Sequence, residues 1–144
     1  MSVTITITKA DVRDEVSRTT AYEGAHGGAF DNTFAKKEDA EMLERYWKEG
    51  TSILTDVWKK YIEDTNHNDD KYEVVLTMPG NFDDNMIGMM EDSAFTYLCN
   101  YIVGKWMEMI SSDKSALYIT TASQSLLELK RAMLHRKSPI RPTD

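Results

Sequence analysis

Residues 37–62 constrain the fold more than any other part of the sequence, because their apolar side chains recur at spacings of three and four. The apolar and aromatic positions are Leu43, Tyr46, Trp47, Gly50, Ile53, Leu54, Val57, Trp58, Tyr61 and Ile62. The opposite face carries the charged residues Glu41, Glu44, Lys48, Asp56, Lys59, Lys60 and Glu63. This periodicity predicts one amphipathic helix over residues 37–62, which at 1.5 Å per residue would be about 39 Å long.

Two segments carry strand patterns. Residues 3–7 alternate β-branched apolar residues with threonine, which predicts a half-buried strand. Residues 71–79 predict a second strand that Pro79 and Gly80 end. We expect the two strands to be neighbours. Because a two-stranded ribbon is only marginally stable in water, it must pack against helices or pair with strands from another subunit.

Three further segments predict helices. Residues 12–22 predict a short one, on which Val12, Val16, Thr19 or Thr20, and Tyr22 would share one side. Residues 81–110 predict one that is apolar on nearly every side, with Asp83, Asp84 and Asn85 at its start. Residues 115–136 predict the last helix. Its part 116–121 is rich in β-formers and could be a strand, but its three-four spacing continues into the rest and favours a helix.

The segments together predict a mainly α fold, a helical bundle of three to four helices with a small two-stranded β element. Residues 1–137 would form a single helical domain with an N-terminal strand, and residues 138–144 an extended C-terminal docking tail. Residues 23–34 are rich in glycine and predict a loop, which Phe30 and Phe34 would fix to the body.

The sequence contains no recognisable catalytic or metal-binding pattern. The three histidines lie in different segments, and the acidic residues 64–70 lack both the glycine and the final glutamate of a calcium loop. The single cysteine, Cys99, stands in an apolar run, which predicts a small buried side chain. We therefore expect no enzyme activity, no cofactor and no metal.

The charge is distributed unevenly. The net charge is −7, yet residues 130–144 contain five of the seventeen Lys and Arg and one of the twenty-four Asp and Glu, so residues 1–129 carry about −11. An acidic surface disfavours general nucleic-acid binding. No stretch approaches the roughly 20 apolar residues of a membrane span, and the N-terminus lacks a signal-peptide pattern, so we expect a protein made in a cytosol with no membrane partner.

The basic C-terminus has three interpretations: an electrostatic nucleic-acid contact, a docking segment for a partner protein, or a solvated helix end. Docking is favoured because two prolines stiffen the segment and lower the entropy lost on binding. The predicted docking residues are Lys130, Arg131, His135, Arg136, Lys137, Pro139, Ile140, Arg141 and Pro142.

The apolar helix predicted over residues 81–110 is a candidate subunit interface, because a chain this short can cover only part of it. Its many methionines suit an adaptable packing surface. The predicted interface residues are Met89, Phe95, Cys99, Val103 and Met107.

The order of elements resembles the small head-to-tail connector (adaptor or neck) proteins of tailed bacteriophages. The resemblance is one of pattern over most of the chain, and it is carried by residues 11–16 (DVRDEV), 20–22 (TAY), 43–47 (LERYW), 97–106 (YLCNYIVGKW) and 134–142 (LHRKSPIRP). It implies a non-enzymatic protein of the virion neck, made in the host cytoplasm. It also implies a homo-oligomeric ring, for which a dodecamer is the expected size, between the portal and the tail or other neck proteins.

Within such a ring an acidic inner surface would let DNA pass through without specific binding, because like charges repel. The C-terminal segment would be the docking arm. The alternative is a small cytosolic regulatory or adaptor protein that binds one protein partner through its Met-rich helix or its basic tail. A DNA-binding protein would need a basic recognition helix, for which only the segment 130–137 qualifies.

Overall fold

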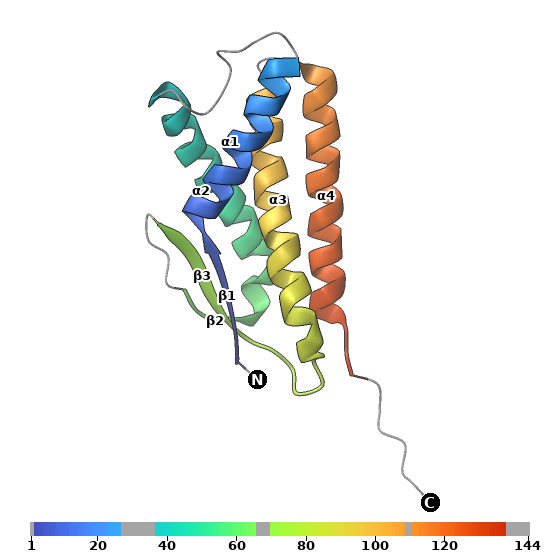
Figure 1. The fold of residues 1–144 in the computed structure, drawn as a ribbon. Coiled ribbons are helices and arrows are strands. Elements are labelled where there is room, and N and C mark those ends of the chain that lie inside the picture. The colour runs from blue at the N-terminus through green and yellow to red at the C-terminus, as the bar shows by residue number, and fades with distance from the viewer. Residues whose placement is uncertain (1, 27–36, 66–69, 109–110, 138–144) are drawn as a thin grey trace, which may run out of the picture.

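The computed structural model describes residues 2–26, 37–65, 70–108 and 111–137, which form four α-helices and a three-stranded antiparallel sheet (Figure 1). This confirms the mainly α fold. In chain order the elements are β1 (Ser2–Thr8), α1 (Lys9–His26), α2 (Lys37–Trp58), the 3₁₀ turn η1 (Lys59–Tyr61), β2 (Ile62–Thr65), β3 (Lys71–Thr77), the 3₁₀ turn η2 (Asp84–Met86), α3 (Ile87–Met107) and α4 (Ser112–Leu134).

The sheet has the order β1-β3-β2. The two predicted strands are neighbours: β1 pairs antiparallel with β3 over its whole length, with Ile5 opposite Val74. The prediction of a two-stranded β element is wrong in one respect, because residues 62–65 add a third strand. These residues were expected to end a helix and begin a turn, but they pair with β3 instead, with an irregularity between Ile62 and Asp64.

Helix α1 follows β1 without a loop and is longer than the predicted 12–22. The backbone N–H of Lys9 donates to the carbonyl oxygen of Asp70 at 2.9 Å, which fixes the start of α1 to the start of β3. Val12 and Val16 share the buried side, as their spacing predicted, and Thr20 rather than Thr19 is buried beside them. The expected contacts of Phe30 and Phe34 lie outside the described residues.

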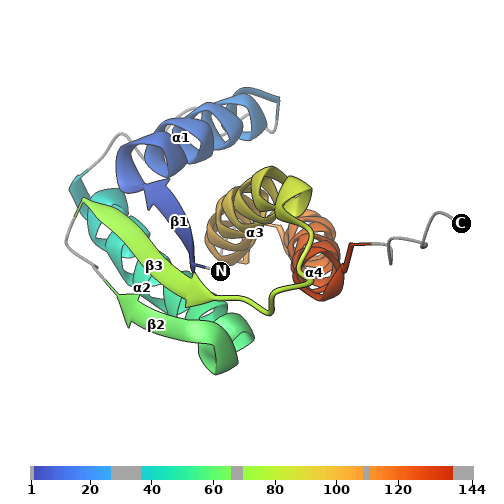
Figure 2. The same cartoon turned by 90° about the horizontal axis from the view of Figure 1, so that it is seen from below.

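Helix α3 lies at the centre of the molecule. Figure 2 shows α1 and the sheet on one side of it and α4 on the other, and α4 packs against α3 more extensively than any other pair of elements does. The Asp83 carboxylate accepts from the backbone N–H of Asn85 at 3.1 Å and so caps the 3₁₀ turn η2, whereas the N-cap residue of α3 itself, Met86, makes no side-chain cap bond. The core that results includes Trp58, Tyr72, Phe82, Leu98 and Ile102.

Helix α4 is helical through residues 116–121, which decides the helix-or-strand alternative in favour of the helix. It ends at Leu134, before the predicted 136, because His135 turns to extended backbone at φ −68° and ψ 133°. The chain then forms a β-bridge, in which Arg136 lies opposite Phe82. This contact brings the C-terminal segment against the loop that precedes α3.

Candidate interaction surfaces

The single cysteine is buried rather than presented to solvent, as its apolar context predicted. Cys99 is 7% exposed on α3, and burial raises the pKa of its thiol to about 12, with a smaller contribution from Glu15. A protonated buried thiol is a poor nucleophile. Within residues 2–26, 37–65, 70–108 and 111–137, no three His, Cys, Asp or Glu side chains are grouped as metal ligands.

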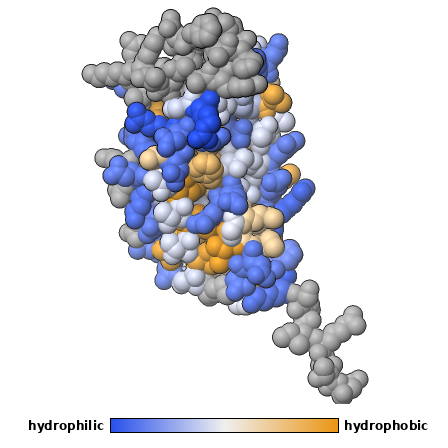
Figure 3. All heavy atoms as spheres, viewed as in Figure 1, coloured by the Kyte–Doolittle hydropathy of each residue, from blue (hydrophilic) through white to orange (hydrophobic). Residues whose placement is uncertain are grey.

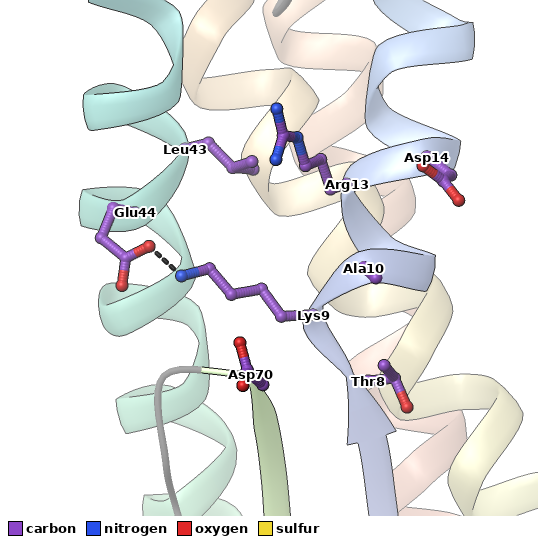
Figure 4. A pocket seen from close by; sticks show the side chains of 8 residues that line it. All are labelled: Thr8, Lys9, Ala10, Arg13, Asp14, Leu43, Glu44 and Asp70. Carbon is purple, nitrogen blue, oxygen red and sulfur yellow. Dashed lines mark hydrogen bonds and ion pairs between the residues drawn. The ribbon is translucent and has the colours of Figure 1, made fainter. Parts of the chain in front are cut away.

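A polar pocket of about 580 Å³ lies where β1 passes into α1, beside α2 and the start of β3 (Figure 4). Lys9 crosses the space between α1 and α2 and forms an ion pair with Glu44. Arg13, Asp14 and Asp70 also line it. The lining holds two basic and three acidic side chains and has no imidazole or thiol, and the Lys9–Glu44 ion pair across it joins α1 to α2.

Three of the predicted docking residues, His135, Arg136 and Lys137, are held by this chain itself. Lys137 N–H donates to the carbonyl oxygen of Asn81 at 2.8 Å, and Asp83 N–H donates to the carbonyl oxygen of His135 at 3.3 Å. The imidazole of His135 lies 3.2 Å from the carboxylate of Asp83. Residues 135–137 are therefore part of the folded domain.

The remaining predicted docking residues divide into two groups. Lys130 and Arg131 are exposed on the last turns of α4. Pro139, Ile140, Arg141 and Pro142 lie outside the described residues. Most of the C-terminal positive charge thus belongs to one end of the helical bundle.

The predicted interface residues of α3 differ in burial. Cys99, Val103 and Met107 are at most 7% exposed, and the packing of this one chain accounts for that burial, so these three are interior residues rather than surface ones. Phe95 is partly buried against the core. Met89 is 51% exposed and lines a hollow of about 480 Å³ between α3 and α4.

Apolar surface gathers over the N-terminal half of α3, between α1 and α4, on the face drawn in Figure 3. Patches of this kind on soluble proteins commonly mark contact sites. Met89, the predicted interface residue with the most exposed surface, belongs to the N-terminal half of α3, which is therefore a candidate contact surface.

Sequence reasoning missed the outward face of α4. Residues 115–127 contain no Asp, Glu, Lys or Arg, in a chain that is 28% charged. Leu117 and Leu127 project from this stretch and are 65% and 50% exposed. The uncharged run was visible in the sequence, but which side of the helix faces solvent depends on how α4 packs on α3.

No helix in the described part of the chain combines the length and apolarity needed to cross a bilayer. The chain was also compared with protein-family models, curated proteins and solved structures, and none of them matches it.

Proposed function

We propose that this chain is a non-enzymatic structural protein of a phage-like virion neck, which assembles as a homo-oligomeric ring between portal and tail. The proposal rests on the resemblance to connector proteins and on the surface of α4. In the proposed assembly, residues 138–144 form the arm that reaches a neighbouring protein, and DNA passes through the ring without specific binding.

The outward face of α4 is the single observation that favours self-assembly most. Leu117 is 65% exposed and Leu127 is 50% exposed, and no charged residue lies between positions 114 and 128. The centres of protein interfaces are depleted of charge and enriched in apolar contacts, whereas the free surface of a soluble domain is typically about a quarter to a third charged.

A ring also needs a second, different surface, because head-to-tail contacts join unlike patches. The exposed Met89 on α3 supplies a candidate, since it lies on a different helix from Leu117 and Leu127. Two unlike apolar patches on one chain suit a closed ring better than a two-fold dimer, in which one patch contacts itself.

The test is sedimentation velocity on the full chain and on two charge variants. Leu127→Asp places a carboxylate in the uncharged face and is expected to reduce the oligomer to single chains. Ser52→Asp adds the same charge to an exposed position of α2 and is expected to leave assembly unchanged. Equal assembly of both variants would remove the α4 face from the proposal. A chain that is never larger than a dimer would favour the cytosolic adaptor alternative.

A further inference from the structure

A groove of two hollows lies between α2 and α4, and α3 forms the floor of the first hollow. Both helices pack against α3 but scarcely contact each other. One hollow of about 290 Å³ lies between Ile53 of α2, Tyr97 and Tyr101 of α3, and Leu126 of α4. A second hollow of about 170 Å³ lies between Val57 and Tyr61 on one wall and Met133 and Leu134 on the other.

The two hollows follow one another along the same helices. Val57 comes one turn after Ile53 on α2, and Lys130 comes one turn after Leu126 on α4. The α4 wall extends from Ile119 to Leu134, which is about 22 Å at 1.5 Å per residue. That length matches about four turns of a bound helix.

The floor of the groove is fixed by polar contacts. The Tyr101 hydroxyl donates to the carboxylate of Glu49 at 3.0 Å, and the Lys105 amine lies 5.7 Å from the Tyr101 ring centre. Burial and the bond to Glu49 raise the pKa of Tyr101 to about 12. A floor held in this way is formed before any partner binds, which lowers the cost of binding.

The walls remain apolar and accessible. Leu134 is 64% exposed and Ile53 is 36% exposed, while Val57 and Tyr61 are partly buried. Apolar grooves between helices accept amphipathic helices, whose side chains at spacings of three and four enter the groove.

Charge identifies the kind of helix that fits. In the first hollow Lys105 and Glu108 form an ion pair at 3.6 Å, so these two charges offset each other. Lys130 lines the second hollow, and Lys60, which precedes Tyr61 in the chain, is exposed near it. Both side chains are exposed, and neither forms an ion pair with another residue of the described ranges. Carboxylates on a bound helix would complement these two amines.

We propose that the α2–α4 groove binds an acidic amphipathic helix of a different protein, with its apolar side chains on α3 and its carboxylates against Lys130 and Lys60. A second copy of this chain is the poorer occupant. The exposed apolar positions Leu127 and Leu134 of α4 stand beside Lys130 and Arg131, so a second α4 in the groove would bring like charges together. The proposal goes beyond the ring, since the groove does not use the exposed side of Leu117.

The test uses designed peptides of about 15 residues and the full chain labelled with ¹⁵N. One peptide has leucines at helical spacing and glutamates between them. A second has the same composition in scrambled order, and a third has lysine in place of glutamate. The acidic patterned peptide is expected to shift the amide signals of Ile53, Val57 and Leu126, and to bind at least about tenfold more tightly than the other two.

Two groove variants and two matched controls complete the test. Ile53→Asp and Lys130→Glu are each expected to bind the acidic peptide about tenfold more weakly than the unmodified chain does. Lys130→Glu is expected to bind the lysine peptide more tightly. Leu117→Asp and Lys48→Glu make the same changes outside the groove and are expected to bind as the unmodified chain does.

Four outcomes would each overturn the proposal. The acidic peptide does not bind, the scrambled or the lysine peptide binds equally well, the shifted signals belong to another face, or Lys130→Glu binds the acidic peptide as tightly as the unmodified chain does. Because Leu117→Asp is expected to disturb ring assembly but not peptide binding, the failure of one proposal is distinguishable from the failure of the other.

Discussion

The indole N–H of Trp58 donates a hydrogen bond to the hydroxyl oxygen of Tyr72 at 3.0 Å, and this contact joins the end of α2 to the central strand of the sheet. The Thr55 hydroxyl lies 2.8 Å from the same oxygen, and the Trp58 and Tyr72 rings are stacked with their centres 6.2 Å apart. Both aromatic side chains are almost fully buried. The tyrosine oxygen is therefore a buried polar junction between the two layers of the fold.

Tyr72→Phe is expected to lower the free energy of unfolding by about 1–3 kcal/mol, because a buried indole N–H loses its partner while the ring packing is kept. The measurement is a urea unfolding curve. Tyr101→Phe serves as the control, since its bond to Glu49 is only partly buried and its loss is expected to cost less than about 1 kcal/mol. Unchanged stability of Tyr72→Phe would contradict the assigned role of Trp58.

Two glycines of α3 are expected to respond in opposite directions to alanine. A Cβ at Gly104 would lie 2.7 Å from Cδ1 of Ile119 and 3.3 Å from its backbone nitrogen, whereas a Cβ at Gly88 would meet nothing within 4 Å. Gly104→Ala is expected to cost about 1–2 kcal/mol, because overpacking exceeds the gain in helix propensity. Gly88→Ala is expected to gain about 0.5–1 kcal/mol. Thermal unfolding of both variants checks the pair, and a stabilised Gly104→Ala would show that α3 and α4 are not this close.

Alkaline pH is expected to destabilise the fold partly through Cys99. Burial raises the pKa of this thiol from 9.0 to about 12, so the folded state retains a proton that the unfolded chain releases. The contribution of the protonated Cys99 to the free energy of unfolding is therefore fully present below about pH 9 and is lost as the pH rises from about 9 towards 12. Urea midpoints across this window should fall less steeply for Cys99→Ala than for the unmodified chain.

The tyrosines, whose usual pKa is 10.0, contribute mainly above pH 10, so the interval just above pH 9 reports chiefly on the thiol. Thiol labelling provides an independent readout: Cys99 should react far more slowly in the folded chain than in urea. Equal labelling rates would contradict its burial.

Two truncations separate the folded part of the C-terminus from the proposed arm. A chain ending at Lys137 keeps the hydrogen bonds between residues 135–137 and residues 81–83 and is expected to unfold at the same temperature as the full chain. A chain ending at Leu134 loses these bonds and exposes the surroundings of Phe82, which is fully buried. It is expected to lose about 1–3 kcal/mol. Calorimetry of the two chains checks this, and equal stability would mean that the Phe82–Arg136 bridge is not a stabilising contact.

Periodicity in the sequence was sufficient to predict the four helices and the strands β1 and β3. The alternation of Val3, Ile5 and Ile7 predicted β1 and its buried face, and the spacing of Val12 and Val16 predicted the inner side of α1. Strand β2 could not be predicted in this way. Its residues Ile62–Thr65 include two carboxylates and have weak strand propensity, so they become a strand only because β3 offers an unpaired edge.

The candidate surfaces were less predictable for a related reason. The basic composition of residues 130–137 was evident, but the contacts of His135 and Lys137 with residues 81–84 join parts of the chain far apart in sequence. Likewise, Cys99 and Val103 belong to an all-round apolar helix, and their burial depends on the arrangement of α1, α2 and α4 around α3.

The mass of the full chain in solution tests the central claim, that this protein assembles into a ring, most directly. Single-particle mass measurement over a range of concentrations, together with electron micrographs of the same sample, gives both stoichiometry and closure. The account predicts one discrete mass, a fixed multiple of the 16.5 kDa chain, and closed rings in the images. Particles of 16.5 kDa at every concentration, or open chains of indefinite length, would contradict it.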